Sequence, residues 1–213
     1  MKDIAMKNLL ILGDSYSTFK GYIPDGYKTY YPSADVTSAE KTWWHILSKE
    51  LGLSIAENNS WSGSTVSYTG REGDCSSTSS FIYRFELLAK SGFLKEREID
   101  TVFVFGATND SWTDVPLGRM GFDNITREDL YDIRPAICKL ALRIREELPS
   151  ARVVFIVNDE LKDEIDATFI AAAEHCDAEV VLLENIDKTT GHPTALGMQQ
   201  IAAQMKKALL DKI

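Results

Sequence analysis

NLLILGDSYS, residues 8–17, joins an unbroken apolar run to a short polar turn. A short run in which every residue is apolar is typical of a parallel strand that is covered on both faces. Gly13 permits a tight turn at the end of that strand, and Ser15 then begins the next segment. The stretch therefore predicts a buried strand with a serine hydroxyl just beyond its carboxyl end.

Strand-like and helix-like patterns alternate along the rest of the chain. Further short apolar runs occur at 53–57, 101–105, 152–157 and 179–183. Apolar residues recur at helical spacing in 41–51, 80–90, 127–148, 161–169 and 198–209, and Pro135 marks a helix start near Arg134 or a kink. This alternation predicts an α/β fold, a doubly wound sheet of about five parallel strands in one domain over residues 1–213. Ligands of such sheets bind at the carboxyl ends of the strands.

Composition limits the classes of function. The net charge is −9 and no basic cluster occurs, so no nucleic-acid partner is expected. No apolar stretch reaches the roughly 18 residues that a membrane span needs. The apolar run at 9–12 is too short for a signal peptide, so a cytoplasmic location is expected, although a chain trimmed of its leader would look the same. Three widely spaced cysteines without a CxxC motif predict free, partly buried thiols and no zinc site.

Ser15 and His192 are the predicted nucleophile and base. A serine hydroxyl is a weak nucleophile at neutral pH and needs a base within hydrogen-bond reach. His45 falls in a predicted helix beside two tryptophans, and His175 falls near a helix end, so both have structural explanations. His192 follows the last predicted strand and precedes the last helix. We expect it to reach Ser15 and to act first as general base and then as general acid.

Two further strand ends supply candidate donors for an oxyanion. Gly63 lies in the turn after the second predicted strand, and its N–H can approach a ligand with no side chain in the way. Asn109 follows the third predicted strand and offers a side-chain amide. Each residue type is common in turns, but four such residues at four carboxyl ends of one sheet are a rarer coincidence. Together they predict a serine hydrolase that acts on an ester.

These blocks resemble the SGNH (GDSL-type) hydrolases. They are the GDS run, a glycine in an N-x-x-x-S-G setting, an asparagine in a GxND-like setting and a late His-Pro, in the family's order over residues 13–197. The resemblance implies a three-layer α/β/α sandwich of flavodoxin-like type. It also implies Ser15 as nucleophile, His192 as base, and an oxyanion hole from the Ser15 N–H, the Gly63 N–H and the Asn109 side chain. Family members hydrolyse esters of sugars and lipids and acyl thioesters, and they need no metal or other cofactor.

The sequence departs from the family pattern at two positions. Ala107 replaces the glycine of the GxND block. Thr189 stands where the family usually has an aspartate, three residues before the histidine. Asp187 is then the tentative third member of the triad, and Glu184 is a weaker candidate. Alternatively, a backbone carbonyl holds the imidazole and the enzyme works as a Ser–His dyad.

The substrate is expected to be a small-molecule or glycan ester. Trp61 and Trp112 lie beside the oxyanion candidates, and Tyr16 follows the nucleophile, so these aromatic residues are candidates for substrate binding. Aromatic loops favour a carbohydrate acetyl esterase. The alternatives are a lipase or acyl-thioesterase, and a flavodoxin-like binding module without catalysis. Neither the natural ester nor the oligomeric state follows from the sequence.

Overall fold

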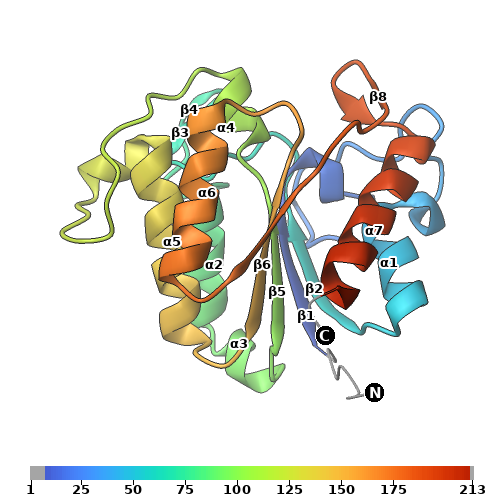
Figure 1. Ribbon diagram of the computed structural model, residues 1–213, viewed down its shortest axis with the longest axis horizontal. Coiled ribbons are helices and arrows are strands. Elements are labelled where there is room, and N and C mark those ends of the chain that lie inside the picture. Colours follow the sequence, from blue (N-terminus) through green and yellow to red (C-terminus); the bar gives the residue numbers. More distant parts are fainter. Residues whose placement is uncertain (1–7, 212–213) are drawn as a thin grey trace.

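The computed structural model describes residues 8–211, in which a parallel sheet lies between two layers of helices (Figure 1). The sheet has five strands in the order β2-β1-β5-β6-β7, and every pairing is parallel. The strands are β1 (Leu9–Gly13), β2 (Ile55–Ser60), β5 (Thr101–Phe105), β6 (Arg152–Val157) and β7 (Glu179–Leu182). This order is the flavodoxin-like one, and it confirms the predicted fold class. β2 extends beyond the predicted 53–57 because polar residues at its end pair with β1.

Helices cover both faces of the sheet (Figure 1). One face carries α2 (Phe81–Lys90), α5 (Ile133–Glu147) and α6 (Asp163–His175), and the other carries α1 (Trp43–Leu51) and α7 (Ala195–Leu210). Side chains of β1 alternate between the two cores, with Leu10 in one and Leu9 and Ile11 in the other. All five residues of β1 are buried, as the unbroken apolar run predicts.

Local sequence explains where the main helices begin. Thr42, Ser80 and Thr194 precede α1, α2 and α7, and each side chain accepts a hydrogen bond from a backbone N–H of the first turn. Pro135 is the third residue of α5, where a backbone N–H has no partner within the helix. The helix therefore starts one residue before the predicted Arg134 and needs no break at the proline.

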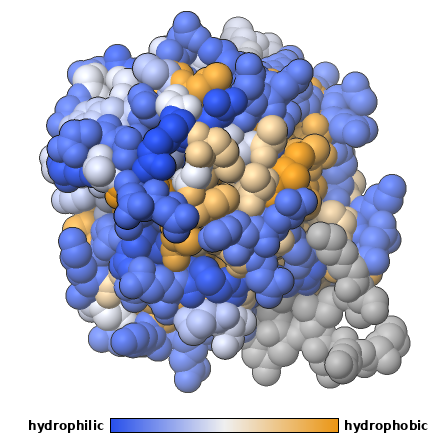
Figure 2. Space-filling view, turned by 60° about the vertical axis from the view of Figure 1, so that its left-hand side comes forward, coloured by the Kyte–Doolittle hydropathy of each residue, from blue (hydrophilic) through white to orange (hydrophobic). Residues whose placement is uncertain are grey.

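The surface is mainly hydrophilic. Figure 2 shows one face, on which hydrophilic residues surround a small group of apolar ones. The large apolar side chains that are exposed are spread along the chain: Tyr22, Leu87, Trp112, Met120, Leu182, Leu196 and Leu210. No helix within residues 8–211 has the length and apolar character needed to cross a bilayer.

The register of the sheet brings the candidate loops together. Gly13 at the end of β1 pairs with Ser60 of β2 on one side and with Phe105 of β5 on the other. The segments that follow these three strands therefore leave the sheet at the same level. Two small hairpins complete this edge, β3 (Thr69–Gly70) with β4 (Gly73–Asp74), and β8 (Lys188–Thr189) with β9 (His192–Pro193). The short helices α3 (Phe93–Glu96) and α4 (Thr108–Trp112) lie before and after β5.

A substitution at Gly106, the residue directly after β5, tests how tightly this edge of the sheet is packed. A Cβ at Gly106 would lie 2.5 Å from Cζ of the buried Phe81 ring. Gly106→Ala should therefore lower the free energy of unfolding by about 1–3 kcal/mol, measured by urea denaturation. In a Phe81→Ala background the same substitution should cost less than about 0.5 kcal/mol, because the clashing ring is gone. An equal cost in both backgrounds would show that the ring is not the cause.

Candidate active site

Ser15 lies in a tight turn at the carboxyl end of β1. The turn is a 3-10 helix, Ser15–Ser17, and Asp14 caps it by accepting a hydrogen bond from the Tyr16 N–H at 3.0 Å. Gly13 is needed there because a Cβ would lie 2.6 Å from Cβ of Ser17. Only 2% of the Ser15 surface is exposed, so its hydroxyl is held within the site.

His192 meets Ser15 from the far end of the chain. Its Nε2 lies 3.0 Å from the Ser15 Oγ, although 177 residues separate the two along the sequence. Its Nδ1 lies 3.4 Å from the backbone carbonyl oxygen of Thr190. A carbonyl oxygen only accepts hydrogen bonds, so Nδ1 is assigned the proton and Nε2 the lone pair. In this tautomer the Ser15 hydroxyl donates to Nε2, which is the arrangement a general base requires.

The structure does not bring Asp187 to His192. The carboxylate of Asp187 instead accepts a hydrogen bond from the hydroxyl of Thr194, the N-cap residue of α7. The tentative assignment of Asp187 to the triad therefore does not fit. The physical reason is the β8–β9 hairpin, because its turn points the imidazole Nδ1 at the Thr190 carbonyl. This geometry matches the alternative in which a backbone carbonyl holds the ring.

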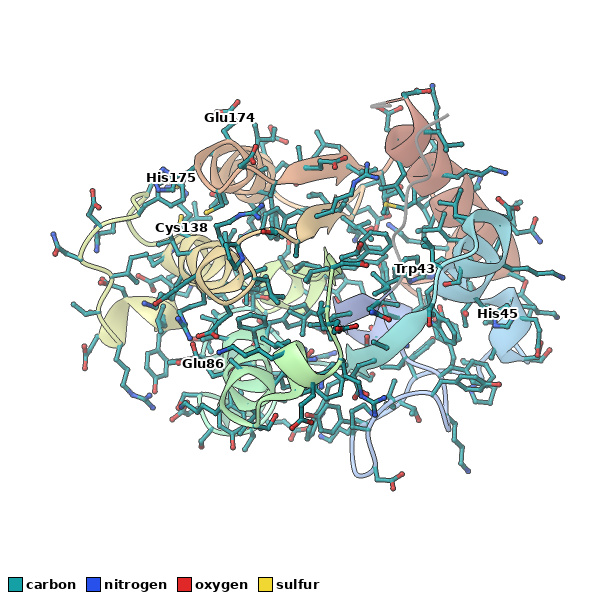
Figure 3. All side chains as sticks on the ribbon, turned by 90° about the horizontal axis from the view of Figure 1, so that it is seen from below. Trp43, His45, Glu86, Cys138, Glu174 and His175 are labelled. Atoms are coloured by element: carbon teal, nitrogen blue, oxygen red, sulfur yellow. The ribbon has the colours of Figure 1, made fainter. Side chains whose placement is uncertain are left out.

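The other two histidines lie outside the site, on opposite sides of the molecule (Figure 3). His45 is in the first turn of α1, as predicted. His175 is the last residue of α6, where the helix dipole favours a cation, and it stacks on Phe122 with ring centroids 3.8 Å apart. Among residues 8–211, no group of three or more His, Cys, Asp or Glu side chains is placed to hold a metal ion.

The candidate oxyanion donors converge on the same edge of the sheet. Gly63 has a φ of +83°, a conformation that suits glycine, and no atom lies within 4 Å of the position a Cβ would take. Asn109, in α4, donates one amide hydrogen to the Ser64 carbonyl at 2.9 Å and keeps the second. Ala107 adopts a φ of 70°, in the left-handed region that glycine enters more readily than alanine.

Arg84 links the segments that carry these donors. Its side chain is fully buried, and its guanidinium donates to the Gly13 carbonyl at 3.1 Å, to the Ser64 hydroxyl at 3.2 Å and to the Asn59 backbone and side-chain oxygens. Its Nε donates to the Ser79 carbonyl at 2.9 Å. Burial lowers the pKa of Arg84 to about 10, so the group stays charged at neutral pH. One side chain therefore ties the turn that carries Ser15 to the loop that carries Gly63.

Burial shifts the pKa values of several ionisable groups in the site. It raises the pKa of Asp14 to about 7, with a smaller contribution from the negative charge of Asp110. Burial also raises the pKa of Asp110, whose carboxylate accepts the N–H groups of Val66 and Ser67 at 2.8 and 3.0 Å. The pKa of His192 is lowered below 6.5, mainly by burial, while the Thr190 carbonyl opposes this effect. His192 is therefore a neutral base at pH 7.

Aromatic side chains enclose the imidazole. Tyr30 stacks on it with ring centroids 3.6 Å apart and planes within 5°. Trp112 meets it edge-on at 5.6 Å, which fits the expected place of Trp112 beside the site. Tyr16 is only 1% exposed, and its hydroxyl donates to the Gly191 carbonyl at 2.5 Å. The expectation that Tyr16 binds substrate is therefore wrong, because its ring and hydroxyl are already committed to the protein.

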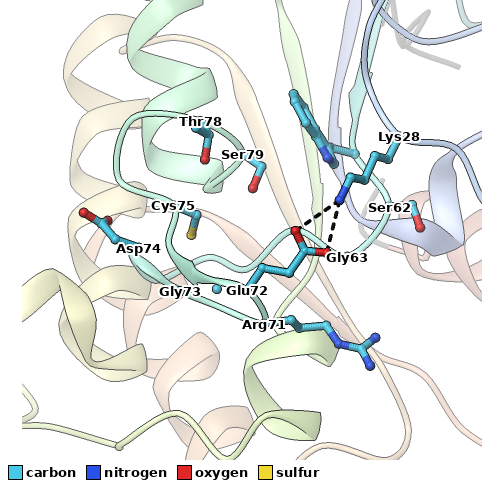
Figure 4. Close-up of a pocket in the computed structure, with 12 residues that line it drawn as sticks. Lys28, Ser62, Gly63, Arg71, Glu72, Gly73, Asp74, Cys75, Thr78 and Ser79 are labelled. Carbon is cyan, nitrogen blue, oxygen red and sulfur yellow. Dashed lines mark hydrogen bonds and ion pairs between the residues drawn. The ribbon is translucent and has the colours of Figure 1, made fainter.

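A polar cavity of about 700 Å³ opens beside Gly63 (Figure 4). Trp61, which packs against Tyr27 with ring centroids 4.3 Å apart, forms part of its wall, and Lys28 pairs with Glu72 at 3.3 Å. The remaining lining is mostly glycine, serine, threonine and charged residues: Ser62, Gly70, Arg71, Gly73, Asp74, Cys75, Thr78 and Ser79. The cavity has room for a polar substrate group next to the candidate oxyanion hole.

Sequence reasoning missed Arg84 and Tyr30. Arg84 had a readable signal, because it lies among Phe81, Phe85 and Leu88 on the apolar face of a predicted helix. A charged residue on a buried face requires partners. Tyr30 was visible only as one of several tyrosines in the loop 16–37 that could line a groove, because the turn that brings it onto His192 cannot be read from the residue pattern.

The chain matches the family model described as GDSL-like lipase/acylhydrolase over residues 7–209. A crystal structure of a GDSL-like lipase, so described, from Bacteroides ovatus ATCC 8483 is 39% identical, with a TM-score of 0.88 over 98% of this chain and 99% of that one. Its counterpart from Bacteroides uniformis ATCC 8492 is also 39% identical, with a TM-score of 0.87 over 96% and 95%. A family two carbohydrate esterase from Clostridium thermocellum shares the fold at 17% identity, with a TM-score of 0.67 over 97% and 64%. Among curated proteins, none matches.

The raised pKa of Asp14 predicts a pH dependence of stability. The protonated carboxyl is favoured in the folded state, so this stabilisation is complete below the unfolded pKa of 3.8 and is lost as the pH rises through about 7. Each pKa unit corresponds to about 1.36 kcal/mol, which limits the loss to about 4 kcal/mol. Asp14→Asn keeps the acceptor for the Tyr16 N–H and removes the titration.

Urea denaturation at pH 5 and pH 8 checks this prediction. The difference in unfolding free energy between the two pH values should be smaller in Asp14→Asn than in the wild type. Asp25→Asn, which makes the same change at an exposed position, is the matched control and should behave like the wild type. Equal pH dependence in the wild type and Asp14→Asn would contradict the assignment.

Proposed function

Because this chain belongs to the GDSL-like lipase/acylhydrolase family, whose members are hydrolases that act on esters, we propose that Ser15 is its nucleophile and His192 its general base. The observation that carries the proposal is the 3.0 Å approach of the Ser15 Oγ to the His192 Nε2. It occurs at the point where the strand order of the sheet reverses, between β1 and β5. Doubly wound sheets bind their ligands there.

The reaction runs in two halves. The Ser15 Oγ bonds to the ester carbonyl carbon while its proton passes to the Nε2 of His192. The carbonyl oxygen gains the electron pair and becomes an oxyanion. When the tetrahedral intermediate collapses, the bond to the leaving oxygen breaks and the imidazolium gives that oxygen its proton, which releases an alcohol and leaves an acyl-serine. Water then attacks the acyl-serine by the same route and releases the carboxylic acid.

Three donors stabilise the oxyanion in this proposal, namely the Ser15 N–H, the Gly63 N–H and the free amide hydrogen of Asn109. Within residues 8–211, neither of the two backbone N–H groups has a hydrogen-bond acceptor. Donors that are held in place before the reaction need no reorganisation when the negative charge develops. Arg84 keeps Gly13 and Ser64 fixed, and so holds the two loops at a constant separation.

A short-chain ester of a carbohydrate is the substrate we propose. The cavity beside Gly63 is lined mostly by polar side chains and glycine, and Trp61 offers an aromatic face that suits a sugar ring. A lipase or thioesterase would need a long continuous apolar groove, which this lining does not form. Two proteins with the same fold, from Clostridium thermocellum and Butyrivibrio proteoclasticus, are described as a carbohydrate esterase and an acetyl xylan esterase. The family assignment sets aside the binding module without catalysis.

Hydrolysis of p-nitrophenyl acetate tests the two catalytic assignments. Ser15→Ala should lower kcat/KM by at least about 1000-fold. His192→Ala should lower it by about 100- to 10,000-fold, the usual contribution of a general base. His45→Ala, which removes a histidine far from the site, is the control. Wild-type activity no greater than that of Ser15→Ala would contradict the proposal.

Chain length tests the proposed substrate class. On p-nitrophenyl esters from acetate to decanoate, kcat/KM should be highest for acetate, because the mostly polar cavity lining offers no continuous apolar groove to a long acyl chain. Acetylated xylan or acetylated oligosaccharides should release acetate, measured by an enzyme-coupled assay, with Ser15→Ala as the blank. A maximum at octanoate or longer would favour a lipase instead.

A further inference from the structure

His192 has no carboxylate partner among residues 8–211, yet its imidazole and its flanking peptide groups are held on several sides. Two tyrosine hydroxyls bind the carbonyls on either side of it, and a third tyrosine stacks on its ring. We propose that Tyr16, Tyr30 and Tyr31 position His192, and that the Tyr30 ring stabilises the imidazolium, the work a carboxylate does in a triad. This inference rests on the proposed role of His192 as base.

Tyr16 and Tyr31 fix the backbone of the hairpin. The Tyr16 hydroxyl donates to the Gly191 carbonyl at 2.5 Å, and the Tyr31 hydroxyl donates to the Pro193 carbonyl at 2.6 Å. Both side chains are 1% exposed, so the rings have no freedom to leave. Burial raises the pKa of both phenols above their ordinary value of 10, so both remain hydrogen-bond donors at any working pH. The peptide groups on both sides of His192 are therefore clamped.

Tyr30 fixes the ring itself. The two rings are nearly parallel, with a centroid separation of 3.6 Å and an interplanar angle of 5°. The Tyr30 N–H donates to Thr18 Oγ1 at 2.9 Å, and the neighbouring Tyr31 ring packs against it at 4.9 Å. A cation over an aromatic face is stabilised by the electron-rich ring, more strongly when water is excluded. Once His192 accepts the Ser15 proton, its imidazolium lies over such a face.

The charged groups around His192 do not supply this stabilisation. Arg71, in the turn between β3 and β4, acts on His192 with a positive charge and lowers its pKa. Lys188, on β8, is paired with Asp159 and Glu160. The Asp187 carboxylate is bound by the Thr194 hydroxyl. A substitution at Tyr30 leaves all these groups in place. A change in the pKa of His192 in such a variant can therefore be attributed to the Tyr30 ring.

The expected kinetic effect is on kcat rather than KM. The imidazolium exists only after proton transfer, so the stack stabilises the transition state more than bound substrate. Tyr30→Leu should lower kcat for p-nitrophenyl acetate about 10-fold, and KM should change by less than about twofold. Tyr30→Phe keeps an aromatic face and should retain about half of the wild-type kcat.

A second readout does not depend on activity. The pKa of His192 can be followed by NMR titration of its imidazole protons in a Ser15→Ala background. Tyr30→Leu should lower this pKa by roughly one unit, because the cation loses its aromatic partner, and Tyr30→Phe should leave it within about 0.3 units. Circular dichroism melts identify any variant that fails to fold. If Tyr30→Leu does not fold, the role of Tyr30 is judged from Tyr30→Phe, compared with Tyr16→Phe and Tyr31→Phe.

Tyr16→Phe and Tyr31→Phe test the backbone clamp, and each should lower kcat about fivefold with KM unchanged. Asp187→Asn keeps an acceptor for the Thr194 hydroxyl and should leave kcat unchanged. The proposal is overturned if Tyr30→Leu alters neither kcat nor the pKa of His192, or if Asp187→Asn lowers kcat about 1000-fold, as loss of a triad acid would. Activity that survives in Ser15→Ala would instead refute the proposed function, while the titration would still decide the role of Tyr30.

Discussion

The hydrogen bonds of the buried Arg84 guanidinium are the interaction on which the proposed catalytic edge of this protein depends. Its donors reach the ends of β1 and β2, which also pair in the sheet, and the loop beyond Gly63. Peptide carbonyls, the Asn59 side-chain oxygen and the Ser64 hydroxyl accept hydrogen bonds from the charged group. A buried charge of this kind is stable only if every donor finds a partner.

The site combines the carboxyl edge of the parallel sheet with a hairpin near the C-terminal end of the chain. The parallel sheet aligns the ends of β1, β2 and β5, and the β8–β9 hairpin delivers His192 from beyond the fifth strand. An aspartate in a triad orients the histidine and stabilises its cation. Here the Thr190 carbonyl faces Nδ1, and the face of Tyr30 covers the ring. The cavity beside Gly63 is lined mostly by polar residues, and Ser15 is deeply buried, which are the observations behind the proposed short-chain ester substrate.

Much of this arrangement was predictable from the sequence because it follows from periodicity and from one rule about sheets. Apolar runs mark the strands, and residues that follow parallel strands meet at one edge, which brings Ser15 and His192 into one site. The assignment of Asp187 to the triad does not fit the structure, because residue spacing does not reveal the conformation of a two-residue hairpin turn. Tyr30 and Arg84 act through contacts between distant segments, and only the folded geometry shows those contacts.

Labelling with a fluorophosphonate tests the central claim, that His192 activates Ser15, most directly. Intact-protein mass spectrometry should show one phosphonyl group per wild-type chain, and peptide mapping should place it on Ser15. His192→Ala should react far more slowly, and Ser15→Ala should not react. A label on another residue, or equal labelling of wild type and His192→Ala, would contradict the account.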